Sequence, residues 1–286
     1  MLIDYFNFWH FAGIMLSIAI YIGLYYILKN KSYNTKKYVL FCLLLLGVVL
    51  HFLKVFVPPY SNNIDRLNND IWLINICAAN IFVFPLIFIS KSSRAKDYMV
   101  YLGLLSGIIS ICVPVEPILK GDLQLEEIMD IVRFYIHHNL LWMVPLLMVK
   151  LDLHKVSYKN SLWGPTGLLL LMLFIILNQV LQSELGFIEL KTNDFFAIKY
   201  KNTSYIWGPN DVVGDFIARF TPSFFKIVPA GIHKGEIKYW PWFWLVVPSY
   251  LLVTPLCFGI SAIFDRNNLK NDIYFLFKKL RYNRNK

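Results

Sequence analysis

Charged side chains are scarce in this chain: they make up 16% of its 286 residues, whereas 57% are hydrophobic and 17% are aromatic. A soluble domain carries about a quarter charged residues and does not contain a series of apolar runs of about 20 residues. The scarcity of charge therefore excludes an ordinary soluble domain and indicates an integral membrane protein. The net charge is +10, and in a membrane protein its meaning depends on which loops carry the basic residues. We expect no nucleic-acid partner.

Cysteine is also rare, with four residues in the chain, and Cys42, Cys112 and Cys257 lie inside apolar runs. So few cysteines in such positions exclude the disulfide framework of a small secreted protein. The sequence has neither the paired spacing of a zinc site nor a cluster of carboxylates and histidines, so we expect no metal and no cofactor. The first apolar run lacks a basic segment before it and a small-residue cleavage site after it, so we expect a span rather than a signal peptide.

Apolar runs of the length that an α-helix needs to cross hydrocarbon occur seven times. Because the runs are continuous rather than alternating, they predict helices and not barrel strands. The expected fold is a single all-α domain, residues 1–286, built as a polytopic bundle of seven transmembrane helices. The expected spans are residues 8–28, 38–57, 71–90, 98–115, 132–149, 162–182 and 241–264.

Basic residues collect in the segments that follow the first, third, fifth and seventh spans. These segments hold 17 of the 28 Lys and Arg residues but only 4 of the 18 acidic residues. Loops rich in Lys and Arg remain on the cytoplasmic side of a membrane. We therefore expect a multi-pass protein of the cell membrane with its N-terminus outside and its C-terminus inside.

Two longer segments lie outside the expected spans. Residues 183–240 mix aromatic and charged side chains with glycine and proline, which predicts short interfacial helices that cap the outer face. Residues 265–286 form a basic cytoplasmic tail that alternates Lys and Arg with aromatic and aliphatic residues. That pattern is typical of an amphipathic helix on the anionic inner leaflet and also of a solvated tail, and the sequence leaves both open.

Polar side chains within the expected spans fall at one depth. Such groups are costly in hydrocarbon and are candidates for function by default. With the orientation above, six spans carry them in their outer parts. A layer confined to one leaflet fits a pocket for an amphiphile, although harmless polar residues also collect at span ends. The layer comprises His10, His51, Asn75, Cys77, Asn80, Ser110, Cys112, His137, His138, Asn139, Asn178 and Gln179.

Cys77 is the candidate nucleophile of this layer. A thiol reacts when a nearby base or positive field favours its thiolate, and His137 and His138 offer such a base from another span. Adjacent residues diverge by about 100° around a helix, so we expect at most one of the two histidines to face Cys77. The sequence does not decide which one. The alternative is a cysteine that acts as a small apolar residue and histidines that hydrogen-bond between helices.

Asn75, Asn80, Asn178 and His51 are the candidate substrate-binding residues. Asn80 lies one turn after Cys77, on the same face of its helix. An asparagine amide can polarise an ester carbonyl, or it can pair with another asparagine across a helix contact.

Several segments resemble signatures of the YwaF-like bacterial membrane-protein family, in the order in which that family carries them. They are Asn75–Ile81 followed by Phe84 and Pro85, Tyr135–Leu140, Asn178, Asn193–Phe196 and Trp240–Phe243. This family is similar to the eukaryotic transmembrane protein 164, a plasmalogen acyltransferase, and more remotely to androgen-induced membrane hydrolases that use Thr and His. The chain departs from the family pattern at Asn75, where a histidine usually stands two positions before the cysteine.

The resemblance implies a lipid acyltransferase or lipid hydrolase that works through a thioester on Cys77, with His137 or His138 as the base. Membrane phospholipids are the expected partners. The alternatives are a non-catalytic protein that binds lipid or transports a small molecule, and a subunit of a larger membrane complex. The sequence does not identify a protein partner, the lipid head group or the acyl chain.

Overall fold

The structure is a computed structural model that describes residues 7–58, 60–64, 67, 71–113, 125–188, 190, 204–232 and 234–284. Within these ranges the fold is helical, and the extended pairing is limited to one bridge between Ile227 and Ile237. Five helices of the described chain are long and apolar enough to cross a membrane: Phe8–Leu28, Tyr33–Phe56, Ser93–Cys112, Tyr158–Glu184 and Phe243–Phe264. The prediction of an all-helical membrane protein is confirmed.

The helix bounds differ in places from the expected spans, because apolar runs do not mark where capped helices begin. Ser32 and Ser92, for example, accept hydrogen bonds from the backbone N–H groups of Thr35 and Ala95, so two helices begin before their apolar runs. The helices are α1 (Phe8–Leu28), α2 (Tyr33–Leu53), α4 (Ile76–Ile89), α5 (Ser93–Cys112), α6 (Leu125–Lys150), α7 (Trp163–Glu184), α8 (Val212–Ala218), α9 (Val246–Pro248), α10 (Thr254–Phe264) and α11 (Arg266–Arg284).

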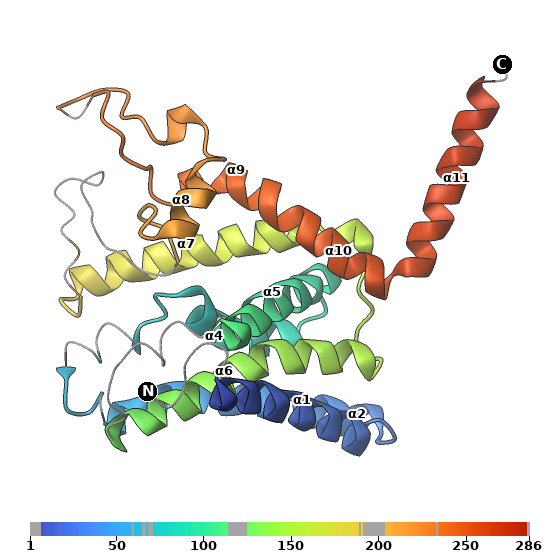
Figure 1. The fold of residues 1–286 in the computed structure, drawn as a ribbon, viewed down its shortest axis with the longest axis horizontal. Coiled ribbons are helices and arrows are strands. Elements are labelled where there is room, and N and C mark those ends of the chain that lie inside the picture. Colours follow the sequence, from blue (N-terminus) through green and yellow to red (C-terminus); the bar gives the residue numbers. More distant parts are fainter. Residues whose placement is uncertain are drawn as a thin grey trace.

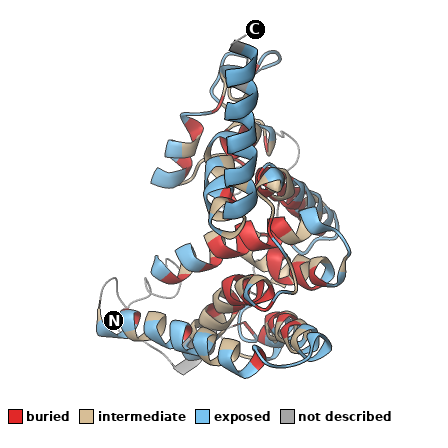
Figure 2. Ribbon diagram, turned by 90° about the vertical axis from the view of Figure 1, so that its right-hand side faces the viewer, coloured by how far each residue is buried: buried red, intermediate tan, exposed pale blue. Residues whose placement is uncertain are grey.

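The bundle is arranged around α5 and α6. Helices α1, α2 and α6 lie along one side, α4 and α5 lie in the middle, and α7 and α10 lie on the other side (Figure 1). Helix α6 contacts α1, α2, α4 and α5, while α5 also contacts α7. The buried residues concentrate in this central part of the bundle (Figure 2).

Two glycines allow α5 and α6 to pack backbone against backbone. A Cβ atom at Gly103 would lie 2.3 Å from the carbonyl oxygen of Leu141, and one at Gly107 would lie 2.8 Å from the carbonyl oxygen of His138. Small residues permit such close approach between membrane helices, where van der Waals packing drives association. The position of α6 relative to the other helices therefore depends on these two glycines.

Helix α4 is shorter than the expected span 71–90. It has 14 residues, and Asn75 caps its N-terminus by accepting a hydrogen bond from the N–H of Ala78 at 2.7 Å. Its length of about 21 Å is less than the hydrocarbon thickness of about 30 Å. The backbone before α4 is bonded to α2 instead: the carbonyl oxygen of Ile71 accepts a hydrogen bond from Nε2 of His51 at 3.0 Å.

A buried polar network fixes the connection between α6 and α7 to the start of α5. The Asp97 carboxylate accepts hydrogen bonds from Nε2 of His154 at 2.7 Å and from the Asn160 amide at 2.6 Å. The Tyr101 hydroxyl donates to the carbonyl oxygen of Ser157 at 3.0 Å. Because Asp97 is fully buried, these donors are needed to offset the cost of removing its charge from water.

The segment 183–240 contains short helices where it is described. Asp211 is the N-cap of α8, and its side chain accepts a hydrogen bond from the N–H of Gly214. After α8, the Thr221 hydroxyl donates to the carbonyl oxygen of Trp244. The expected cap also includes residues 189, 191–203 and 233, which lie outside the described residues.

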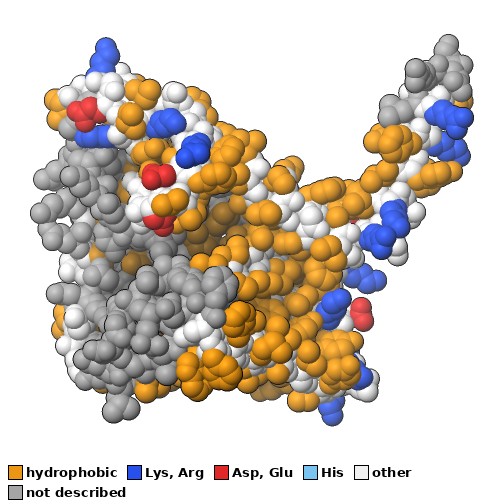
Figure 3. All heavy atoms as spheres, in the orientation of Figure 1, with side chains coloured by type: hydrophobic (Ala, Val, Ile, Leu, Met, Phe, Trp, Pro, Cys, Tyr) orange, Lys and Arg blue, Asp and Glu red, His pale blue; other side chains and the backbone are white. Residues whose placement is uncertain are grey.

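The tail forms a helix, α11, which extends away from the bundle beyond α10 (Figure 1). Lys and Arg side chains line it, with exposed hydrophobic side chains between them (Figure 3). In its second turn, Asp272 accepts a hydrogen bond from the Tyr158 hydroxyl and lies 2.7 Å from the Lys159 ammonium. This contact with Lys159 holds the pKa of Asp272 below its usual value.

We expect Gly103→Ala to destabilise the protein, because the new methyl group would overlap the Leu141 carbonyl oxygen. The expected loss is about 1–3 kcal/mol, as for other overpacked sites. Thermal unfolding of the purified variant in detergent would measure it. The control is Gly23→Ala, since no atom lies within 4 Å of the Cβ position at Gly23. Equal unfolding midpoints for the two variants would contradict the prediction.

We expect the contact at Asp272 to loosen in acid. Because the folded-state pKa of Asp272 is depressed, its contribution is present above the ordinary aspartate pKa of about 3.9 and is lost as the pH falls through the folded value. Hydrogen exchange over residues 266–276, corrected for its intrinsic pH dependence, should accelerate in that range. Asp272→Asn should exchange fast at neutral pH already, whereas Asn271→Ala should resemble the wild type. Wild-type exchange in Asp272→Asn would contradict the assignment.

Candidate functional site

Helices α2, α4 and α6 meet at Gly47. A Cβ atom at this glycine would lie 3.2 Å from the Leu140 side chain and 3.5 Å from the Ile81 side chain. One residue from each helix therefore meets at this point, and the missing side chain of Gly47 allows the contact. The three helices are thereby fixed in rotation relative to one another.

One turn from this contact, toward the same end of the bundle, the three helices carry His51, Cys77 and His137. His51 follows Gly47 by four residues, Cys77 precedes Ile81 by four, and His137 precedes the α6 contact residue by three. Residues three or four apart lie on the same face of a helix. The interface that holds the helices together thus continues into the polar candidates.

The rings of His51 and His137 are stacked. Their centroids are 6.1 Å apart with an angle of 25° between the planes, and both side chains are buried, with exposures of 1% and 5%. Phe82 of α4 packs edge-on against His51 at 5.2 Å. Among the described residues, Nδ1 of His51 and Nε2 of His137 have no hydrogen-bond partner. Buried polar atoms of this kind are uncommon and indicate a place for a ligand or a water molecule.

His138 has a different environment from that of its neighbour. Its Nδ1 donates to the carbonyl oxygen of Phe134 at 2.8 Å, one turn earlier in α6, and its ring packs against the Phe134 ring at 4.1 Å. Both contacts of the His138 ring are therefore with residues of α6 itself. Of the two adjacent histidines, His137 is the one that packs against α2.

Asn80 and Cys77 lie on the face of α4 that meets Tyr98 of α5. The Tyr98 hydroxyl donates to Oδ1 of Asn80 at 2.8 Å, and Asn80 is completely buried. Within the described chain, Nδ2 of Asn80 has no acceptor. Cys77 is half-buried and is close enough to Tyr98 for the two side chains to interact electrostatically. Tyr98 was not a sequence candidate, because nothing distinguishes it from the other aromatic residues of an apolar run.

An apolar cavity of about 490 Å³ lies beside this pair, between α4, α5 and α7. Tyr98, Ile87, Leu171 and Phe174 are part of its lining. Arg94 also lines it, and the guanidinium lies over the ring of Trp163 at 5.2 Å. The cavity is large and apolar enough to receive part of a hydrocarbon chain next to Asn80.

The remaining candidates have other surroundings. Asn75 uses its side chain to cap α4. Asn178 of α7 accepts a hydrogen bond from Nε2 of Gln182 at 3.4 Å, and the adjacent Gln179 accepts from Nε1 of Trp207 at 2.8 Å. These α7 residues form a second polar cluster, which contacts Trp207 of the segment 183–240. The structure thus connects His51 with His137 and Asn80 with Tyr98, whereas Asn178 belongs to a separate group.

Comparison with family models confirms the expected similarity to transmembrane protein 164. No curated protein and no solved structure matches the chain. The sequence model of the TMEM164 family matches residues 5–260, which include every candidate residue from His51 to Asn178 and most of the described helices, but not α11. Since this match extends over most of the sequence, the chain belongs to the TMEM164 family.

Proposed function

We propose that this protein is a lipid acyltransferase that forms a thioester on Cys77 and uses His137 as its base. The observation that carries the proposal is the meeting of α2, α4 and α6 at Gly47, one turn from Cys77, His51 and His137. Membership of the TMEM164 family supports the membrane location, and the resemblance to a plasmalogen acyltransferase supports the reaction.

The reaction has two steps. In the first, the Cys77 sulfur attacks the carbonyl carbon of a lipid ester while Nε2 of His137 takes the thiol proton. The ester C–O bond breaks, the proton passes to the departing lysolipid alkoxide, and the acyl group remains on sulfur. In the second, a lipid hydroxyl attacks the thioester, His137 takes its proton, and Cys77 is released as a thiol. With water in place of the lipid hydroxyl, the same steps make a hydrolase.

Several groups around Cys77 suit these steps. Cys77 is the second residue of α4, where the helix dipole favours negative charge on the sulfur. Nδ2 of Asn80, one turn away, is a donor for the oxyanion. His51 acts as a positioning residue, because its ring stacks on His137. The acyl chain would occupy the cavity beside Tyr98.

We assign the base to His137, because its ring packs against His51 of α2, whereas the ring of His138 packs against Phe134 of its own helix. Asn75 and Asn178 receive no role in the reaction, since the first caps α4 and the second lies in the α7 cluster.

The proposed reaction takes place in the outer leaflet. We infer seven crossings: the five helices that are long enough to span a membrane, together with α4 and α6. The excess of Lys and Arg at one end of the bundle and along α11 supports a cytoplasmic C-terminus (Figure 3). The N-terminus and the site around Cys77 would then lie toward the outside.

One observation favours a second candidate, a non-catalytic transporter. The last span contains a π-helical segment, Ser249–Val253, between Pro248 and Pro255. Such irregular segments are frequent at functional sites and kinks, and interrupted spans occur in transporters. The formation of a thioester distinguishes the two candidates.

We expect purified protein incubated with mixed phospholipids to gain an acyl mass that hydroxylamine removes and that maps to Cys77 by intact-protein and peptide mass spectrometry. Free fatty-acid release, measured in parallel, detects turnover if water resolves the thioester quickly. Cys77→Ala should lose both signals, and Cys112→Ala should keep them. If the wild-type protein gives neither an adduct nor fatty-acid release, the catalytic proposal is wrong.

We expect His137→Ala to slow acylation by about 10²–10⁴-fold, the usual contribution of a general base. The matched variant is His138→Ala, from the adjacent position of the same helix, which should slow the reaction much less. Rates of adduct formation under single-turnover conditions would measure the difference. A larger loss in His138→Ala than in His137→Ala would reverse the assignment of the base.

The orientation can be tested with single cysteines placed at Val212 and Lys279 in a background without the native cysteines. In intact cells, a membrane-impermeant maleimide should label position 212 in α8, and it should label position 279 in α11 only after permeabilisation. Labelling of position 279 in intact cells would show that the orientation is wrong.

A further inference from the structure

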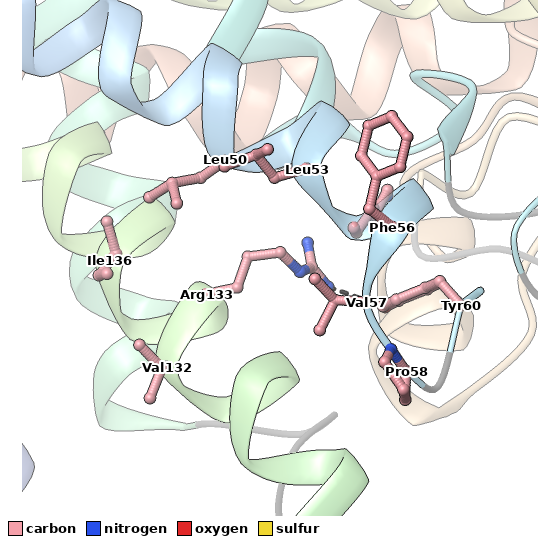
Figure 4. Close-up of a pocket in the computed structure, with 10 residues that line it drawn as sticks. Leu50, Leu53, Phe56, Val57, Pro58, Tyr60, Val132, Arg133 and Ile136 are labelled. Carbon is pink, nitrogen blue, oxygen red and sulfur yellow. Dashed lines mark hydrogen bonds between the residues drawn. The ribbon is translucent and has the colours of Figure 1, made fainter. Parts of the chain in front are cut away.

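A second cavity, of about 140 Å³, lies between the end of α2 and the first half of α6. Its walls are largely apolar. Figure 4 shows Leu50 and Leu53 on the α2 side and Val132 and Ile136 on the α6 side. This composition suits the hydrocarbon part of an amphiphile.

Two cations and a phenol converge at one part of this cavity. Arg133 extends from α6 toward Tyr60 (Figure 4) and donates a hydrogen bond from its Nη2 to the Tyr60 hydroxyl at 2.9 Å. Lys54 also lines the cavity, and its ammonium lies 5.2 Å from the centre of the same ring. Lys54 is 4% exposed, so its charge acts in surroundings of low dielectric, where electrostatic interactions are strong.

The cation pair is adjacent to the histidine pair. Arg133 precedes His137 by four residues in α6, and Lys54 follows His51 by three at the end of α2. One turn of an α-helix is about 5.4 Å long, so the cations lie about one turn beyond the stacked histidines on the same two helices. A ligand held by the cations would extend toward the proposed reaction centre.

We propose that this cavity binds the phosphate of a phosphate-bearing lipid, with Arg133 and Lys54 as its cationic ligands. The Tyr60 hydroxyl is the third donor, and the first methylene groups of the lipid lie against Leu50 and Val132. As a substrate subsite the assignment rests on the proposed function, because it places the lipid ester beside His137. As a binding site it stands independently of the reaction.

Phosphate fits these groups better than a neutral head group does. The planar guanidinium of Arg133 can donate two parallel hydrogen bonds to phosphate oxygens, and the Lys54 ammonium adds a compact charge. Three donors from Arg133, Lys54 and Tyr60 also match the several acceptor oxygens of a phosphate.

The test measures lipid binding in the Cys77→Ala protein, which cannot form a thioester. Purified protein in detergent is titrated with short-chain lysophosphatidate, and the bound fraction is read by native mass spectrometry. Two further probes are a monoacylglycerol with the same acyl chain and inorganic phosphate. Lysophosphatidate should bind at least about tenfold more tightly than either, because only it offers both the phosphate and the acyl chain.

Arg133→Gln and Lys54→Gln should each weaken lysophosphatidate binding by about tenfold or more and leave monoacylglycerol binding unchanged. The control is Lys270→Gln, which removes an exposed cation of α11 and should have no effect. Leu53→Trp, which fills the cavity but keeps both cations, should also weaken binding. Thermal unfolding of each variant separates loss of binding from loss of folding.

Three results would overturn the assignment. The first is equal binding of monoacylglycerol and lysophosphatidate. The second is displacement of the lipid by inorganic phosphate at similar concentrations, which would identify a site for free phosphate. The third is unchanged binding in Arg133→Gln, Lys54→Gln and Leu53→Trp. None of these results depends on the acyl adduct, so failure of the reaction and failure of the phosphate site can be told apart.

Discussion

The fold depends on the close contact between α5 and α6, where Gly103 and Gly107 let the two backbones meet. Because this contact fixes the rotation of α6, it determines that His137 packs against His51 of α2 while the adjacent His138 does not. The same contact fixes α5, which presents Tyr98 to Asn80 of α4. Both halves of the candidate site are therefore held by the pair of helices at the centre of the bundle.

The class and most helices of this protein follow from its apolar runs, but the helix ends do not. Apolarity identifies the residues that a membrane can surround, whereas a helix begins where a side chain caps its free N–H groups. Helix α4 is the clearest case. Residues 71–75 look like the start of its span, yet Asn75 is the cap and the Ile71 carbonyl oxygen bonds to His51. The competition between a helical and a tertiary hydrogen bond cannot be judged from hydropathy.

The candidate site was predictable in part. His51, Cys77, Asn80 and His137 were candidates because ionisable and polar groups are conspicuous in apolar runs. Their partners were not predictable, since Tyr60 and Tyr98 look like ordinary aromatic residues in a chain that is 17% aromatic. The pairing of Asn80 with Tyr98, and of Arg133 with Tyr60, depends on how far each helix is rotated. A sequence gives the face of each helix but not the neighbour that this face meets.

The short length of α4 determines where its N-terminus lies, and the proposed nucleophile Cys77 is at that N-terminus. Its neighbour α5 has 20 residues and α4 has 14, so the N-terminus of α4 does not extend as far along the bundle as the end of α5. In the proposed orientation this N-terminus lies below the outer surface of the membrane, and Cys77 occupies its first turn. A helix dipole stabilises negative charge more strongly in surroundings of low dielectric than in water. If α4 began at residue 71, Cys77 would lie in its second turn, beyond the first turn in which the helix dipole stabilises negative charge.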